Sequence, residues 1–469
     1  MKAIARLAVG LCLGGCILAW GASSYGEEMS KDAMMELIQE LKQRVEDLEN
    51  KVEGVEDQVP ANRALTERRM DQLEEQLDAK KELADNDFRV YWKSGLRLDS
   101  GDGNYKLKIG GRIQNDFAWF DQNKNDLCLL DDAEDGVEFR RARLYISGDI
   151  YDSVAFKAQY DFAGGDADFK DMYIALNDIP TVGQLKIGHF KEPFSLEELT
   201  SSKYITFMER ALPNVFAPSR NTGVQLMNDF FDGRITAAAG LFYDADSYGE
   251  GADEDRGWHF TTRLTGLPYY AEEGRKLVHL GMSYSHQNPD EDIRYRQRPE
   301  AHLSPRYINT GNFRSDAVDL WDFEAALVYG PFSLQSEYFY TDVDTDWLCG
   351  DEDFDGWYVY GSYFLTGEHR PYKTSSGKFD RVKPTSNFNL WGGGEKGWGA
   401  WEVALRYSEL DLNSDRLLRG GQEDNITAAL NWYLNPNTRV MLNYIYADIE
   451  HDLYEDDMQT LQARFQVDF

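Results

Sequence analysis

The chain ends in LQARFQVDF (residues 461–469), where apolar and polar side chains alternate at every position. Successive side chains of a β-strand point to opposite faces, so this period predicts a strand with one apolar and one polar face. The same alternation occurs over residues 105–119, where Ile113 falls on the apolar face and Arg112 on the polar one. It recurs at residues 154–162, 401–407 and 430–434. The chain is therefore predicted to consist mainly of two-faced strands.

Strands of this kind suit two folds, a soluble β-sandwich and a barrel in a membrane. Segments of about ten residues with one apolar face fit a barrel wall between lipid and water. A soluble sandwich would show the same alternation. The last strand closes on Phe469 and resembles the recognition signal of bacterial outer-membrane barrels. The sequence therefore favours a barrel embedded in the lipid of the bacterial cell outer membrane.

The composition agrees with a membrane barrel and excludes some partners. The 469 residues include 82 acidic and 49 basic ones, a net charge of −33, which argues against nucleic acid as a partner. A mean hydropathy of −0.57 leaves no room for helical membrane spans. The 27 tyrosines, 25 phenylalanines, 11 tryptophans and 40 glycines suit an outer-membrane barrel with aromatic girdles.

The number of strand-like runs sets the predicted architecture. Residues 88–469 contain sixteen or seventeen such runs, and single-chain bacterial barrels have even numbers of strands. We therefore predict an all-β fold, a 16-stranded antiparallel transmembrane β-barrel with a water-filled interior. Long connections are expected at residues 120–136, 191–220, 287–317, 344–355 and 367–397.

Residues 1–26 have the composition of a secretory signal peptide. They begin with basic residues, continue with an apolar run over residues 7–20, and end in small residues before Gly26. The apolar run is too short for a stable membrane anchor. A lipoprotein signal with Cys16 as its cysteine is the alternative, but residues 17–20 stay apolar beyond it. We expect export and cleavage near Gly26.

Residues 27–87 are predicted to form an α-helical coiled-coil stalk. Apolar residues follow a 4-3 spacing at Met34, Ile38, Leu41, Val45, Leu48, Val52, Val55 and Val59. This heptad pattern ends at Pro60 and returns weakly beyond it. An amphipathic helix packed on its own domain is the alternative, but the apolar stripe is narrow for a globular helix. We expect a homo-oligomeric stalk, a homotrimer if the barrel is trimeric, with contact to the cell wall.

A set of ordered motifs in the barrel region resembles the phosphate-selective porin O and P family. The motifs include Gly110-Gly111-Arg112-Ile113-Gln114, Phe139-Arg140-Arg141-Ala142, Gly188-His189-Phe190, Thr200-Ser201-Ser202-Lys203, Glu209-Arg210 and Lys378-Phe379-Asp380. The resemblance covers about residues 88–469. It implies a trimeric sixteen-stranded outer-membrane porin with inward-folded loops, in which a ladder of arginines leads anions to a lysine-rich constriction.

The resemblance also implies pore-lining, anion-binding residues. Ladder positions are matched by Arg112, Arg140, Arg141, Arg294, Arg296 and Arg298, and basic positions near the constriction by Lys157, Lys203 and Arg210. Guanidinium groups match phosphate oxygens as a planar fork. The alternative for residues 294–298 is that these arginines neutralise neighbouring carboxylates on a solvated loop. Arg140 lacks the polar parity of Arg141, so both can face the pore only if the strand ends or bulges there.

The connection 191–220 is the predicted constriction loop, and it departs from the family pattern. Glu198 stands where phosphate-selective members place a lysine, and a poorly solvated carboxylate there would repel phosphate. His302 likewise replaces an expected arginine. Two functions therefore remain open: passage of small anions such as phosphate, and general diffusion without anion preference. A stalk that tethers the outer membrane to the cell wall is compatible with both.

Other motifs give no catalytic or cofactor site. No metalloprotease, nucleophile-elbow or phosphate-loop motif occurs, so we expect no enzyme, no cofactor and no metal centre. The run Asp351-x-Asp353-x-Asp355-Gly356 matches the first half of a calcium loop, but a solvated acidic hairpin connection is the simpler interpretation. Cys128 and Cys349 remain after the signal is removed, and their pairing is left open.

Overall fold

A computed structural model describes residues 35–51, 69–71, 88–122, 132–251, 257–289, 292–345, 350–391, 396–414, 419–452 and 454–469. The chain divides into two compact units, Met1–Glu82 and Leu83–Phe469. The predicted signal peptide and both retained cysteines, Cys128 and Cys349, lie outside the described residues.

In the first unit, residues 35–51 and 69–71 are helical. Ile38, Leu41 and Leu48 of the predicted heptad seam are exposed on this helix. The heptad positions beyond residue 51 up to Pro60 lie outside the described residues. The structure therefore shows a helix where the heptads begin, and it does not show the coiled coil. None of the described helices is both long and apolar enough to cross a membrane.

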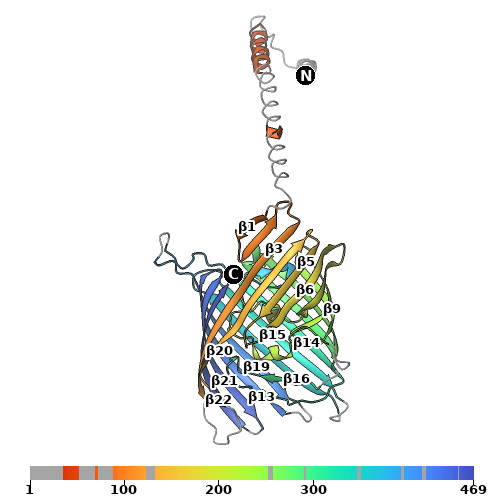
Figure 1. The fold of residues 1–469 in the computed structure, drawn as a ribbon. Helices are drawn as coiled ribbons and strands as arrows, with labels where there is room; N and C mark the ends of the chain where they lie inside the picture. The colour runs from red at the N-terminus through yellow and green to blue at the C-terminus, as the bar shows by residue number, and fades with distance from the viewer. Residues whose placement is uncertain are drawn as a thin grey trace, which may run out of the picture. The chain divides into compact units, whose positions relative to one another are not determined.

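The second unit is a closed barrel of sixteen antiparallel strands (Figure 1). In chain order they are β3 (Tyr105–Gln122), β4 (Gly136–Ile150), β5 (Val154–Asp161), β6 (Asp168–Ile179), β7 (Gly183–Lys191), β8 (Arg220–Phe230), β9 (Ile235–Tyr243), β10 (Trp258–Ala271), β11 (Lys276–Asn288), β14 (Ala317–Tyr329), β15 (Phe332–Asp344), β16 (Glu352–Phe364), β19 (Ala400–Asn413), β20 (Arg419–Asn435), β21 (Thr438–His451) and β22 (Tyr454–Asp468). β22 pairs with β3, Phe465 opposite Asn115, and this pairing closes the ring. The predicted strand number is confirmed.

A short hairpin precedes the ring. β1 (Phe88–Trp92) pairs with β2 (Leu96–Ser100), and β2 pairs with the start of β3 through Leu98 and Leu107. Because β22 pairs only with the later part of β3, the hairpin extends the wall beyond the C-terminal end of β22. The region predicted as barrel from residue 88 therefore contains two additional strands outside the closed ring.

Side chains alternate between the outer face and the lumen as the sequence predicts. On β22, Leu461 and Phe465 are exposed on the outer face, whereas Gln462 and Arg464 are buried on the inner one. Arg112 on β3 is buried as well. An apolar exterior with a polar interior is the pattern of a barrel wall in lipid.

The two ends of the barrel differ in their connections. Turns at residues 151–153, 180–182, 231–234, 330–331 and 436–437 are short, and among the described strands only the connection between β16 and β19 is long at this end. At the opposite end the connections that follow β3, β7, β9 and β11 are long. Strand β7 ends at Lys191 and strand β8 begins at Arg220, which confirms the predicted connection 191–220. The connections between β11 and β14 and between β16 and β19 also match the prediction.

The predicted connection 344–355 is wrong at its second half. Strand β16 begins at Glu352 and pairs with β15, Asp342 opposite Asp353. Asp353 and Asp355 therefore lie on a strand, and Phe354 between them is buried on the inner face of the wall. The calcium-like run is not a hairpin connection as predicted.

The lumen is partly filled by inward-folded connections, as the family resemblance implies. The connection 191–220, with α3 (Leu196–Leu199) and the 3₁₀ helix η1 (Leu212–Phe216), folds inward. Its phenyl rings pack on inward side chains of the wall: the centroid of Phe194 lies 6.2 Å from that of Phe339, and Phe207 lies 5.3 Å from Tyr360. The apolar core spans the side formed by β14–β16 and β19–β22. Burial of these rings holds the loop against one wall.

Two further connections carry short elements. The connection between β11 and β14 contains β12 (Arg296–Gln297) and β13 (Ile308–Asn309), which pair with each other. The connection between β16 and β19 contains β17 (Tyr372–Lys373), η3 (Thr374–Ser376) and β18 (Lys378–Phe379). Ile308 and Phe379 are buried, so parts of both connections pack inside the barrel.

Candidate functional site

A cavity of about 760 Å³ lies between the constriction loop and the wall formed by β3–β9. Its lining includes three acidic residues, Asp171, Glu198 and Asp380. Its fifteen basic residues are Lys108, Arg112, Arg140, Arg141, Arg143, Lys157, Lys170, Lys186, Lys191, Lys203, Arg210, Arg220, Arg263, Lys373 and Lys378. A chain with a net charge of −33 thus surrounds this cavity with positive charge.

Six of the nine predicted site residues line the cavity. They are Arg112, Arg140, Arg141, Lys157, Lys203 and Arg210. The other three, Arg294, Arg296 and Arg298, lie on the connection between β11 and β14 and are not part of the lining. For the predicted residues that lie on strands, the alternation of the sequence correctly indicated the face of the wall, because this alternation is a local property of each strand.

A β-bulge turns both Arg140 and Arg141 toward the lumen. Gln114 pairs with Arg141 and Asn115 with Phe139, so Arg140 is the extra residue of β4. Arg140 donates two hydrogen bonds to Glu209, at 2.9 and 3.0 Å, and Arg141 lies 3.8 Å from the same carboxylate. The sequence allows both arginines to face the pore only if the strand ends or bulges there, and the structure shows this bulge.

Glu198 is neutralised by two cations within the loop and wall. Its Oε1 lies 2.7 Å from Lys191 Nζ, and its Oε2 lies 3.2 Å from Arg210 Nη1. Burial alone would raise the pKa of Glu198, but Arg210 and Lys191 lower it to about 2. The carboxylate is therefore ionised and paired, so the predicted repulsion of anions is offset by its own partners.

Asp171 is paired in the same way. It accepts hydrogen bonds from Lys157 and, at 2.8 Å, from Arg220 Nε. The predicted site residue Lys157 is therefore a partner of a carboxylate. Each of these two acidic residues lies between two basic ones, which leaves a net positive charge around it.

Arg112 and Lys203 are less closely engaged with carboxylates than Lys157 and Arg210 are. Arg112 donates to Ser202 Oγ, and among the described residues no carboxylate forms an ion pair with Arg112. Lys203 Nζ lies 3.7 Å from Asp468 and 5.3 Å from the ring centroid of Tyr204. Burial lowers the pKa of Lys203 to about 7. These groups are available to bind an anion in the cavity.

Several lining cations were missed by the sequence analysis. Lys186, on β7, places its ammonium 4.9 Å from the ring centroid of Phe190. Lys378, on the connection between β16 and β19, is half-buried, and desolvation lowers its pKa to about 7. The parity of β7 could have indicated Lys186. No local pattern could have placed Lys378 in the cavity, because its position depends on how a long connection folds.

The three arginines outside the cavity cluster near its rim. Arg294 and Arg296 are exposed, and Arg298 is half-buried. Burial lowers the pKa of Arg298, and the nearby charge of Arg140 lowers it further. The missed residue Arg306 has a pKa lowered by burial and by these three arginines. Within the part of the chain that the structure describes, residues 294–298 form no ion pair with a carboxylate.

Comparisons with known proteins agree with this geometry. The model of the family "Phosphate-selective porin O and P" matches residues 107–469. The chain belongs to this family. The predicted resemblance is confirmed, and the protein is an outer-membrane porin.

Relatives of the porin span most of its length. Porin O of Pseudomonas aeruginosa is 28% identical over 429 residues, 82% of this chain and 93% of that protein. An uncharacterized protein of Caulobacter vibrioides is 31% identical over 376 residues, 77% of this chain and 72% of that protein.

Solved porins are similar to this chain at low sequence identity. The anion-selective porin from Comamonas acidovorans shares 14% identity with a TM-score of 0.48, over 78% of this porin and 100% of that chain. OmpT of Vibrio cholerae, in a trimer form, shares 12% identity with a TM-score of 0.48, over 77% and 99%.

Proposed function

We propose that this porin passes small anions, phosphate above all, passively across the outer membrane. The observation that carries the proposal is the charge of the cavity, fifteen basic and three acidic lining residues in a strongly acidic chain. Rings of arginine and lysine in a pore favour anions, and a narrow cavity of one sign raises the local concentration of the opposite ion. Guanidinium groups bind phosphate oxygens in pairs, which adds a preference for phosphate.

The basic residues suggest a path for the anion. Short turns of outer-membrane barrels face the periplasm and long loops face outward. An anion would therefore meet the cluster of Arg294, Arg296, Arg298 and Arg306 first, pass Arg140, Arg141 and Arg112, and leave past Lys186 and Lys378. Weak binding at several successive sites permits both entry and release. The chain's role is passage, not catalysis.

General diffusion without anion preference is the second candidate, since acidic residues line the same cavity. Two of the three, Glu198 and Asp171, are each paired with two cations. This pairing favours the anion-selective function over the alternative. A measurement of ion selectivity separates the two functions.

Reversal potentials in a salt gradient across planar bilayers test the proposal. An anion-selective sign, with chloride current blocked by added phosphate, is the expected result. A cation-selective or neutral pore would overturn the anion path and leave the general diffusion porin.

We further propose three regions, an export signal over residues 1–26, a stalk over residues 27–87 and a barrel over residues 88–469. The exposed apolar side chains of the helix at residues 35–51 support self-association into a coiled coil. We propose a homotrimer whose stalk contacts the cell wall. Deletion of residues 30–83 should leave conductance intact and loosen the envelope. Normal envelope stability after the deletion would contradict the tether.

A further inference from the structure

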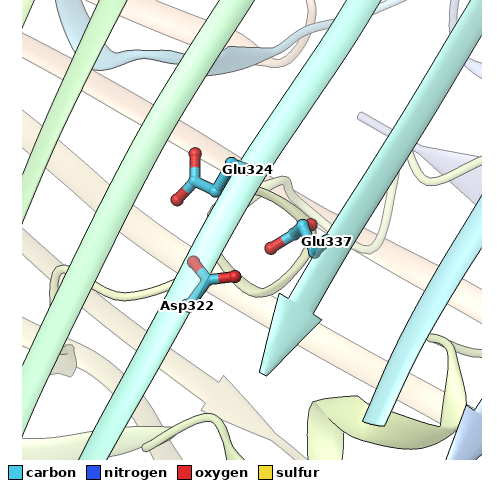
Figure 2. A group of neighbouring side chains, drawn as sticks. All are labelled: Asp322, Glu324 and Glu337. Atoms are coloured by element: carbon cyan, nitrogen blue, oxygen red, sulfur yellow. The ribbon is translucent and has the colours of Figure 1, made fainter. Parts of the chain in front are cut away.

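We infer that Asp322, Glu324 and Glu337 bind a hard divalent cation, such as Ca²⁺ or Mg²⁺, in the inner wall of the barrel. The residues come from the neighbouring strands β14 and β15 (Figure 2). One carboxylate oxygen of each lies within 4.8 Å of the others. All three side chains are buried, at most 3% exposed.

The charges in this cluster do not balance when all three carboxylates are ionised and no ligand is bound. Arg263 on β10 donates two hydrogen bonds of 2.7 Å to Glu324, and its guanidinium is the positive group that pairs with the cluster. His279 Nε2 lies 2.9 Å from the same carboxylate. Three buried carboxylates beside one guanidinium leave an excess of two negative charges. Buried charges in proteins are paired or coordinate metals, and a divalent cation supplies the missing charge.

One oxygen of Asp322 supports a ligand independently of this charge argument. Asp322 Oδ2 accepts a hydrogen bond from Ser283 Oγ at 3.1 Å. Asp322 Oδ1 is fully buried and has no hydrogen-bond partner among the described residues. A buried carboxylate oxygen without a donor is costly. Asp322 is also one of the three residues whose carboxylate oxygens converge, so its unpaired oxygen supports a bound cation there.

The other two carboxylates have donors that orient them. Glu337 accepts from Ser195 Oγ, from the backbone N–H groups of residues 196 and 197, from Gln335 and from Tyr358. Glu324 accepts from Arg263, His279 and Ser283. Such donors are the usual outer shell of metal-binding carboxylates.

Two of these contacts are long and are the ones that a cation would replace. They are Ser283 to Glu324 at 3.2 Å and Gln335 to Glu337 at 3.3 Å. Release of Ser283 Oγ from Glu324 provides a fourth oxygen near the cation. An all-oxygen set of this kind selects Ca²⁺ or Mg²⁺ over softer metals.

The cation would stabilise two of the three inward connections. Glu337 holds the start of α3 through Ser195 Oγ at 2.6 Å, and α3 belongs to the constriction loop. Arg263, held by Glu324, donates to the carbonyl of Gly377 at 2.8 Å in the connection between β16 and β19. The site therefore joins the barrel wall to the constriction loop and to the connection between β16 and β19.

Metal content of the full-length porin tests this inference directly. The protein is unfolded with chelator, refolded in detergent with Ca²⁺ or Mg²⁺, desalted and analysed by atomic emission. We expect one retained cation per chain and a higher unfolding temperature than in chelator. Asp322→Asn should abolish both effects. The matched control is Asp319→Asn on the outer face of the same strand, where Asp319 pairs with His286, and it should retain both.

Two results would overturn the inference: no retained cation in the refolded wild type, or equal retention in Asp322→Asn. A wild type that is equally stable with and without chelator, and binds no metal, would assign a buried proton to Asp322 instead. If Asp322→Asn does not assemble, chelation and resupply of the wild type decide alone. The metal content does not depend on ion selectivity, so a cation-selective pore that retains the metal would refute only the proposed function.

Discussion

The carboxylate of Glu198 lies 3.2 Å from the guanidinium of Arg210 in the constriction loop. Lys191 approaches the other carboxylate oxygen at 2.7 Å. A negative charge at the narrowest predicted segment is thus held by two positive ones, and the three groups together remain positive. The charge that a basic group contributes to the cavity therefore depends on the carboxylate that pairs with it.

Glu198→Gln should increase anion selectivity. Removal of the carboxylate leaves Lys191 and Arg210 unpaired, and one unit charge at about 4 Å in water-like surroundings contributes about 1 kcal/mol, or about fivefold in anion affinity. Reversal potentials and phosphate block measure the change. Unaltered selectivity would show that Glu198 has no electrostatic contact with the permeating ion.

Arg112→Gln should weaken phosphate binding by about tenfold or more, because a hydrogen bond to a charged group contributes about 1.5–3 kcal/mol. Arg112 is buried in the lining and, of the described carboxylates, none pairs with it. Phosphate block of chloride current measures the effect. Arg234→Gln, at a site that does not line the cavity, is the control and should behave as the wild type.

Anion selectivity should fall as the pH rises from about 6 to about 8. Burial lowers the pKa of both Lys203 and Lys378 to about 7. Below that pH the two ammonium groups are charged and attract anions; above it they are neutral. Reversal potentials across this range give the profile. Lys203→Arg and Lys378→Arg together should flatten it, since arginine stays charged, and a persistent slope would assign the titration elsewhere.

Phe207→Ala should release the constriction loop and raise single-channel conductance. Phe207 is buried and packs on Tyr360 at 5.3 Å, and loss of such a ring costs about 3–5 kcal/mol. The barrel wall does not depend on this contact, so the protein should still insert in bilayers. Phe231→Ala removes a ring that is 75% exposed and should leave conductance unchanged.

Replacement of Arg294, Arg296 and Arg298 by glutamine should reduce anion conductance mainly at low salt. These side chains lie outside the cavity lining, so they act by long-range attraction and not by direct binding there. Such attraction is screened at high ionic strength. The conductance of the variant should therefore be lower than that of the wild type at about 0.01 M salt and equal to it at about 1 M salt. Equal losses at both would indicate direct binding.

The wall of the barrel follows from the sequence alone. A two-residue period is a property of each strand by itself, so it places Arg112 inside and Phe465 outside without reference to any distant residue. Counted along the chain, the same period gave sixteen or seventeen runs, and the preference of single-chain barrels for even numbers selected sixteen strands. The break between runs indicated the connection 191–220. Strand alternation alone places Arg141, but not Arg140, on the polar face. The sequence therefore showed that the strand had to end or bulge for both arginines to face the lumen, but it did not show that the bulge forms.

The contents of the lumen were decided by tertiary structure. Ion pairing of Glu198, the position of Lys378 and the convergence of Asp322 with Glu337 each join segments that the linear pattern does not relate. The aromatic contacts that fill one side of the barrel arise in the same way. Side-chain alternation fixes the face on which a residue lies, whereas its partners across the lumen depend on how long connections fold inward.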